Sequence, residues 1–329
     1  MNNTEKNLDF VALGDIVIDS FIRLQIGHVT ENPKELCMPY GTKIPFEFAE
    51  EVPAVGNSAN ASVSAARLGL SSGLIVNIGD DQHGKECIER LTQEKVSTEY
   101  VAINKGFTTN YHYVLWFEQD RTILIKHEDY PLRMPDIGSP KMFYLSSLGE
   151  KSLPFHNDIA DYLEAHPEIR LVFQPGTYQI KFGAKALERI YKRTELFFCN
   201  VEEAQIILGT DSRDIPTLLA GIKNLGPKLP VITDGPDGSY TYIDGTPHHL
   251  PIYPDEKPAY ERTGAGDAFA STFSIAILKG LDVGTAMKHG SINSMSVCEY
   301  VGAQKGLMTD EKLESYMKKQ PEGWDAKSI

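Results

Sequence analysis

A glycine-rich turn runs into a segment of helical period in the stretch Glu261-Arg262-Thr263-Gly264-Ala265-Gly266-Asp267-Ala268-Phe269. The two glycines let backbone N–H groups approach an anion closely, and the positive end of the following helix would point at the same place. Asp267 would repel a phosphate that is merely bound. It suits a general base that takes a proton from a hydroxyl during phosphoryl transfer. The alternative is an ordinary turn with Asp267 as a first-turn helix carboxylate.

Short apolar runs alternate with segments of helical period along most of the 329 residues on either side of this stretch. The predicted strands are residues 10–13, 73–78, 142–145, 171–173, 196–199 and 231–233. The predicted helices are residues 57–68, 156–165, 184–193, 202–208, 216–225, 266–279, 284–300 and 310–319. Short, wholly apolar strands separated by helices are typical of a mostly parallel sheet covered on both faces. The sequence therefore predicts an α/β fold.

Two segments, residues 15–55 and 108–127, alternate in polarity and lack a helical pattern. Within the second, residues 108–116 pair naturally with residues 122–127 across a turn at 118–121. We expect antiparallel strands that form a small accessory sheet, a lid on a core made of residues 1–14, 56–107 and 128–329. The alternative is that these strands merely extend the main sheet.

The predicted helix that follows Gly56 is built of unusually small residues, which lets it pack close to the sheet. Its first turn offers Asn57, Ser58 and Asn60 as hydrogen-bond groups that suit the hydroxyls of a substrate. The alternative is capping, in which Asn57 or Ser58 satisfies free backbone N–H groups of the helix.

Two polar stretches follow buried strands, where ligands bind in α/β proteins. Asn200 and Glu203 could orient a magnesium ion through its waters, since Mg²⁺ usually keeps several of them. The alternative for this pair is a capping box at a helix start. The stretch Thr233-Asp234-Gly235-Pro236-Asp237-Gly238 could cradle a nucleotide or be an ordinary turn.

Composition argues against several classes of protein. Acidic residues number 45 and basic residues 32, a formal net charge of −13, which disfavours a nucleic-acid binder or an anionic-membrane binder. The four cysteines are scattered without a C-x-x-C pair, as expected of reduced thiols rather than a zinc site. Residues 1–9 lack the apolar core of a secretory signal, and no apolar run has membrane-spanning length. We expect a soluble, cytoplasmic protein.

Together these stretches resemble the ribokinase family, also called the PfkB family of carbohydrate kinases, in the family's order and over essentially the whole chain. Thr263-Gly264-Ala265-Gly266-Asp267 matches the core of the family's C-terminal signature, D-T-T-G-A-G-D. The resemblance implies that Asp267 is the catalytic base and that the N–H groups of Gly264, Ala265 and Gly266 form the anion hole. It also implies a three-layer ribokinase-like fold with a β-sheet lid.

The resemblance also assigns residues to the substrate. Residues 56–69 resemble the N-terminal signature, which makes Gly56 and Asn60 substrate contacts. Gly14-Asp15-Ile16-Val17-Ile18-Asp19 is similar to the family's opening motif, whose last aspartate, here Asp19, binds sugar hydroxyls.

Metal and nucleotide contacts follow in the same way. Asn200 and Glu203 match the N-x-x-E motif that the family uses for magnesium and phosphate. Thr233, Gly235 and Gly238 match the T-x-G-x-x-G turn that lines the family's ATP site.

Four departures from the family pattern concern specificity. Val55 stands where the N-terminal signature usually has a glycine, which narrows the substrate pocket. Glu261-Arg262 replaces Asp-Thr, which leaves it undecided whether this chain has the family's monovalent-cation (K⁺) site. Residues 174–177 replace the usual D-P-N-x-R. Ser291 falls where many members carry an adenine-side asparagine, and Asn293, two residues later, is the candidate for that contact.

The resemblance implies an ATP- and Mg²⁺-dependent kinase that transfers the γ-phosphoryl group to a hydroxymethyl group of a sugar. One alternative is a nucleoside kinase, with Tyr111, Tyr113 and Trp116 stacking on a base, although these aromatics equally suit the core of a sheet. Another is a catalytically silent regulator that binds a nucleotide or a sugar. Exposed strand edges in the lid would allow a homodimer.

Overall fold

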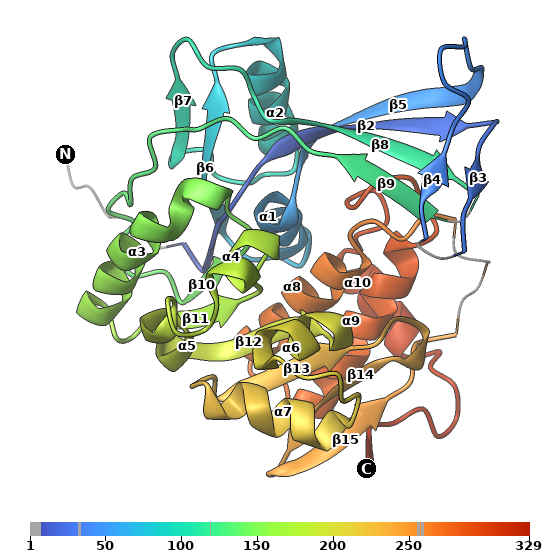
Figure 1. Cartoon of the computed structure of the whole chain (residues 1–329). Helices are drawn as coiled ribbons and strands as arrows, with labels where there is room; N and C mark the ends of the chain where they lie inside the picture. The colour runs from blue at the N-terminus through green and yellow to red at the C-terminus, as the bar shows by residue number, and fades with distance from the viewer. Residues whose placement is uncertain (1–7, 32–33, 119, 255–256, 258–259) are drawn as a thin grey trace.

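The structure is a computed structural model that describes residues 8–31, 34–118, 120–254, 257 and 260–329. The strands of its main sheet are β1 (Phe10–Leu13), β6 (Ser72–Gly79), β7 (Val101–Asn104), β10 (Met142–Leu145), β11 (Arg170–Phe173), β12 (Thr194–Asn200), β13 (Leu229–Thr233), β14 (Ser239–Ile243), β15 (Thr246–Leu250) and β16 (Lys327–Ser328). Their order is β16-β15-β14-β13-β12-β11-β10-β1-β6-β7 (Figure 1). Neighbours from β7 to β13 are parallel and β14, β15 and β16 are antiparallel, so the predicted mostly parallel sheet is confirmed.

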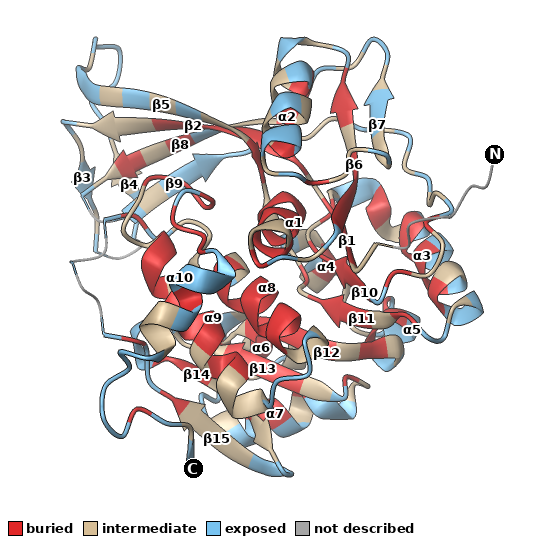
Figure 2. Cartoon of the chain, turned by 180° about the vertical axis from the view of Figure 1, so that it is seen from behind, coloured by how far each residue is buried: buried red, intermediate tan, exposed pale blue. Residues whose placement is uncertain are grey.

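Helices cover both faces of this sheet (Figure 1). One face packs against α1 (Asn57–Arg67), α2 (Gln82–Gln93), α8 (Ala265–Leu278), α9 (Val283–Val297) and α10 (Asp310–Met317). The other packs against α3 (Leu153–Ala165), α4 (Thr177–Phe182), α5 (Glu188–Arg193), α6 (Val201–Leu208) and α7 (Ile215–Asn224). Buried residues are concentrated in α1, α8 and α9, between the sheet and the outer helices (Figure 2).

The central strands are wholly apolar because each of their faces meets a hydrophobic core. In β1, Phe10 and Ala12 belong to the core on one face, and Val11 and Leu13 to the core on the other. All four are at most 1% exposed. Successive side chains of a strand point to opposite faces, so a strand covered on both sides has no polar position to offer.

A second, smaller sheet is separate from the main one. Its strands are β2 (Val17–Leu24), β5 (Phe46–Val55), β8 (Tyr111–Phe117) and β9 (Asp120–Leu124), in the order β5-β2-β8-β9. Strands β3 (His28–Val29) and β4 (Leu36–Cys37) pair beyond its end (Figure 1). The predicted hairpin forms as β8 and β9, although Gln119 of its turn lies outside the described residues. The alternative, an extension of the main sheet, is wrong.

Two predicted helices are shorter in the structure than the sequence indicated. The helix predicted at 184–193 is α5 alone, because Gly183 takes a φ of +82° that ends α4, and residues 184–187 form turns. The helix predicted at 284–300 ends at Val297, where the Cys298 carbonyl accepts bonds from Tyr260 N and Glu261 N. Helices α2 and α4 and strand β7 were not predicted. No helix in the described ranges has both the length and the apolar character needed to cross a bilayer.

Candidate active site

Three amide side chains hold the carboxylate of Asp267, the third residue of α8. Asn57 Nδ2 donates to Oδ1 at 3.0 Å, Asn60 Nδ2 to Oδ2 at 2.7 Å and Gln174 Nε2 to Oδ1 at 3.1 Å. The donors come from the start of α1 and from the end of β11, where parallel strands present ligand sites. Residues 210, 207 and 93 positions apart in sequence thus converge on one carboxylate.

The environment of Asp267 favours a carboxyl group that ionises closer to neutral pH than usual. Burial raises its pKa, the three amide donors oppose that rise, and the nearby Asp19 adds to it. The net direction is upward. A base whose pKa approaches the working pH is the kind that proton abstraction needs.

The turn before α8 requires glycine at its first position. Gly264 has a φ of +83°, and a Cβ atom there would lie 2.2 Å from Ala303 Cβ. At Gly266 a Cβ would meet nothing within 4 Å, so the first turn of α8 faces open space. Backbone N–H groups in the first turn of a helix have no partner within that helix. Here Ala265 N donates to the Arg262 carbonyl of the preceding turn at 3.3 Å.

Glu261 fixes the start of this turn and faces the small sheet. Its Oε1 accepts bonds from Thr263 N at 2.8 Å and from Thr263 Oγ1 at 2.6 Å, and the residue is 2% exposed. Arg121 of β9 brings its Nε to within 3.8 Å of the same oxygen. The guanidinium therefore brings a positive charge close to the buried carboxylate of Glu261.

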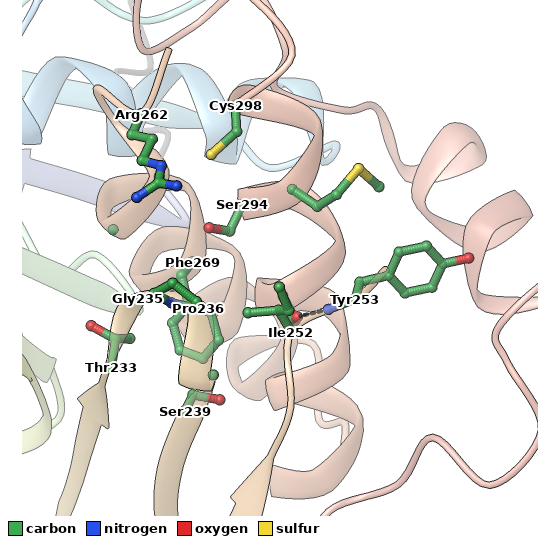
Figure 3. Close-up of a pocket in the computed structure, with 15 residues that line it drawn as sticks. Thr233, Gly235, Pro236, Ser239, Ile252, Tyr253, Arg262, Phe269, Ser294 and Cys298 are labelled. Carbon is green, nitrogen blue, oxygen red and sulfur yellow. Dashed lines mark hydrogen bonds between the residues drawn. The ribbon is translucent and has the colours of Figure 1, made fainter. Parts of the chain in front are cut away.

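A cavity of about 210 Å³ opens on the other side of the turn (Figure 3). Thr233, Gly235 and Gly238 line it, together with Arg262 and the first turn of α8. Figure 3 places Arg262 at one end of the cavity and Ser239 at the other. At Gly238, with a φ of +94°, a Cβ would lie 2.2 Å from the Leu250 carbonyl oxygen, so the turn depends on this glycine.

Asn293 does not line this cavity. It is fully buried in α9, where its Nδ2 donates to Thr272 Oγ1 at 2.7 Å and its Oδ1 accepts from Met308 N at 2.9 Å. Ser291, two residues earlier in α9, lines the cavity instead. The expected nucleotide contact at Asn293 is therefore corrected: its amide joins α9 to α8 and to the C-terminal segment.

Asn200 and Glu203 form a capping box at the start of α6. Asn200 Oδ1 accepts from Glu203 N at 2.8 Å, and Glu203 Oε2 accepts from Asn200 N at 2.9 Å. These bonds engage one of the two carboxylate oxygens. Burial, with a contribution from Asp267, raises the pKa of Glu203, so the two carboxylates lie within electrostatic reach.

The predicted substrate residues gather next to Asp267, though not all as expected. Gly56 has a φ of +110°, and a Cβ atom there would lie 2.7 Å from the Asp15 carbonyl oxygen. This glycine therefore lets α1 begin close to the backbone that follows β1. No side chain caps α1, which removes the capping alternative. Asn60 is 3% exposed and its Oδ1 accepts from Gln304, so its amide positions Asp267. Asp19 is buried, and its Oδ1 lacks a hydrogen bond among the described residues.

The lid aromatics divide between two faces of the small sheet. Trp116 is 1% exposed and packs edge-on against Tyr260 at 4.9 Å, on the inner face. Tyr111 and Tyr113 alternate with it along β8 and therefore point to the outer face. A base bound beside Asp267 would not reach these two tyrosines.

Sequence reasoning noted residues 174–177 as a departure from the family pattern but gave Gln174 no role, and it missed Arg121 altogether. Gln174 directly follows a predicted buried strand, which is the signal that could have identified it. Arg121 carried no signal, because only the folded hairpin brings it to Glu261.

Comparisons with known proteins agree over the length of the chain. A 5-dehydro-2-deoxygluconokinase of Bacillus subtilis (strain 168) is 25% identical over 348 aligned residues, covering 97% of this chain and 98% of the relative. The crystal structure of a Methanocaldococcus jannaschii nucleoside kinase has a TM-score of 0.75 at 17% identity and covers 95% of this chain and 99% of its own. Arabidopsis thaliana ribokinase complexed with ribose and ATP has a TM-score of 0.78 at 18% identity, covering 94% and 99%.

The family assignment rests on a further match. The family model described as pfkB family carbohydrate kinase matches residues 47–310, which include the start of α1, the capping box of α6, the turn at residues 233–238 and the turn before α8. The resemblance read from the sequence and the ribokinase-like fold are thereby confirmed. The chain belongs to the pfkB family of carbohydrate kinases, phosphotransferases that act on an alcohol group.

Proposed function

We propose that the protein uses ATP and Mg²⁺ to phosphorylate a hydroxymethyl group of a sugar, with Asp267 as the catalytic base. One observation carries the proposal: a half-buried carboxylate, held by three amide donors, lies in the first turn of α8 beside open space. The attacking hydroxyl would give its proton to Asp267 as its oxygen bonds to the γ-phosphorus. The N–H groups of Gly264, Ala265 and Gly266 would stabilise the negative charge on the transferring group.

The cavity beside the anion-hole turn suits the nucleotide. Thr233, Gly235 and Gly238 would line the bound nucleotide, and Arg262 would add a positive charge on the phosphate side. A glycine-rich turn opposite the positive end of a helix is the combination that binds phosphates. We propose a cytoplasmic location, which the free thiols of Cys37, Cys87 and Cys199 support.

Glu203 is the residue that would hold Mg²⁺, with Asn200 beside it. The fit rests on the carboxylate oxygen that the capping box leaves unused and on the proximity of Glu203 to Asp267. When bound, the ion neutralises charge on the phosphoryl oxygens. Glu203 would orient the water ligands of the ion through its carboxylate oxygen, and Asn200 would hold Glu203 in place through the capping bonds.

The rival functions make different demands on the site. A nucleoside substrate has support from the similarity to nucleoside kinases, but Tyr111 and Tyr113 face away from Asp267 and would not stack on its base. A silent regulator would not need three amides aligned on one carboxylate. Measurement of ADP formation with a panel of sugars and nucleosides separates all three: we expect turnover that depends on a sugar.

Replacing Glu203 by glutamine tests the metal assignment. Glutamine keeps an oxygen for the capping bond but removes the charge, so we expect a higher Mg²⁺ requirement and a kcat lowered by about tenfold or more, with sugar KM nearly unchanged. Asp282→Asn, at the N-cap of α9, is the matched control and should leave the magnesium dependence alone. Unaltered magnesium dependence in a folded Glu203→Gln enzyme would assign the residue to capping alone.

We propose that the small sheet, residues 15–55 and 108–127, closes over the substrate as a lid. Trp116 reports on closure because its ring is buried against Tyr260 of the core. In a Trp324→Phe background, which leaves Trp116 as the single tryptophan, sugar plus a non-hydrolysable ATP analogue should change the fluorescence emission of Trp116. Protease cleavage within 108–127 should slow in parallel. Ligand-independent values of both measurements would contradict a mobile lid.

A homodimer formed through the lid is the remaining part of the proposal. The edge strands β5 and β9 expose Phe46, Ile123 and Leu124, which are 55%, 39% and 51% exposed. Unpaired apolar edges are the surfaces through which strands of two chains join.

A further inference from the structure

Two histidines of the small sheet face two aspartates at the sugar end of the site. His112 Nδ1 lies 3.4 Å from Asp19 Oδ1, and His127 Nδ1 lies 3.4 Å from Asp15 Oδ2. The two imidazole rings are 5.3 Å apart, so the four side chains form one group. Strand register explains the first pair, because Asp19 of β2 and His112 of β8 are direct partners in the parallel ladder.

This group borders the reacting end of the site. Asp19 is close enough to Asp267 to help raise its pKa. Asp15 directly follows Gly14 at the end of β1, and its carbonyl accepts a 2.8 Å bond from Ser58 Oγ, one residue after the Asn57 that holds Asp267. A sugar whose hydroxymethyl group meets Asp267 would therefore place its other hydroxyls against the histidine–aspartate pairs.

Several polar atoms of the group are buried without a hydrogen bond. His112 Nε2 has no hydrogen-bond partner among the described residues. Asp19 Oδ1 and Asp15 Oδ2 face the histidine nitrogens at 3.4 Å but make no hydrogen bond there, and the Asp19 side chain is 10% exposed. Buried polar atoms are costly to leave unpaired, so these atoms suit a ligand. A His112 ring that carries its proton on Nδ1, toward Asp19, presents Nε2 as an acceptor that a substrate hydroxyl can satisfy.

Burial raises the pKa of Asp15 to about 7, so at about pH 8 this aspartate adds a negative charge to the group. No lysine or arginine in the described part of the chain pairs with Asp15, Asp19 or Asp267. Asp15 and His127 also border a cavity of about 470 Å³, whose other charged residues are Glu128, Asp129, Glu150, Asp158 and Lys151. The single lysine is paired with Asp129 at 2.5 Å. A substrate carboxylate would meet carboxylates here, with no free cation to compensate.

We propose that His112 and His127 are specificity-determining residues that, with Asp15 and Asp19, select an uncharged polyhydroxy substrate and reject sugar acids. This inference rests on the proposed function and names its substrate class. It separates this chain from its relatives that are named for a gluconate, since a gluconate carries a carboxylate at one end. Two effects would give this specificity: a substrate hydroxyl donates a hydrogen bond to a buried acceptor that otherwise lacks one, and a substrate carboxylate is repelled by the carboxylates of Asp15 and Asp19.

The test compares matched substrates in the wild-type enzyme and in variants. ADP formation is measured with neutral sugars (D-ribose, D-glucose, D-fructose) and with the corresponding acids D-ribonate and D-gluconate. We expect kcat/KM for the best neutral sugar to exceed that for its acid by about tenfold or more. Asp15→Asn, assayed at about pH 8, should narrow this ratio by about fivefold, because it removes one negative charge.

Substitution of the histidine separates recognition from folding. His112→Phe keeps the ring volume but loses both nitrogens, so sugar KM should rise by about tenfold while kcat and the KM for ATP change little. His112→Gln, which restores a polar group, should recover part of the affinity. His248→Asn, at a histidine of β15 whose Nδ1 contacts the Thr246 carbonyl, is the control and should change neither.

The outcomes distinguish this inference from the function on which it rests. Higher kcat/KM for a sugar acid than for its neutral counterpart would overturn the inference and leave the kinase function intact. An unchanged sugar KM in His112→Phe would remove His112 from recognition. Absence of ADP formation with every sugar and acid would instead refute the proposed function itself.

Discussion

Asp267→Asn is expected to lower kcat by a factor on the order of 10²–10⁴ while ATP binding is retained or strengthened. An alcohol is a poor nucleophile at neutral pH, and the amide cannot accept its proton. The substitution also removes a negative charge near the γ-phosphate, which should favour nucleotide binding. Steady-state kinetics and calorimetric titration with ATP measure the two effects separately.

The pH profile adds a second readout for Asp267. Because burial raises its pKa, wild-type activity should increase with pH as the carboxyl group ionises, and then level off. The variant should lack this acidic limb. Asp310→Asn, which removes an exposed carboxylate paired with Lys279, is the control. A folded Asp267→Asn enzyme with most of its turnover would refute the base assignment, and loss of ATP binding would assign this residue to the nucleotide site instead.

Gly264→Ala is expected to combine a loss of stability with a loss of activity. A left-handed φ of +83° costs an alanine about 1–2 kcal/mol, and displacement of Ala303, 2.2 Å from the new Cβ, adds about 1–3 kcal/mol. The turn that directs the anion-hole N–H groups must move, so kcat should fall by about 10² or more. Thermal unfolding and steady-state kinetics measure the two losses.

Gly280→Ala is a closely matched control for that variant. Gly280 has a φ of +84°, and its Cβ would meet nothing within 4 Å. It should therefore show the cost of the backbone conformation alone and keep its activity. Equal stability of the two variants, with full activity in Gly264→Ala, would mean that the contact with Ala303 does not hold the turn in place.

Much of the fold was predictable because its signals are local. A strand such as β1, whose residues alternate between two cores, must be apolar throughout, and the sequence displays that run directly. Helix α2 was missed because its apolar pattern is weak: of its twelve residues only Gly84, Cys87 and Leu91 are buried. Its start is fixed by Asp81, which accepts a bond from Gly84 N at 2.9 Å and caps the helix.

The candidate site was predictable where a residue type and a turn coincide. Asp267 and Gly264 stand out in sequence because an anion site and a base need that arrangement. Gln174 and Arg121 act only through partners that the fold brings to them, at Asp267 and Glu261. Asn293 illustrates the opposite error: its position in the chain suggested the nucleotide, but its helix face is turned inward, where it bonds to Thr272.

The central claim is transfer of the γ-phosphoryl group to a terminal hydroxymethyl group, and ³¹P NMR of the product tests it most directly. The enzyme is incubated with Mg²⁺, ATP and the best neutral sugar, and the spectrum is recorded with and without coupling to protons. The account predicts equal amounts of ADP and a monoester whose phosphorus couples to the two protons of a terminal CH₂, with both products formed about 10²–10⁴ times more slowly by Asp267→Asn. Sugar-independent release of inorganic phosphate, or an ester on a ring hydroxyl, would contradict it.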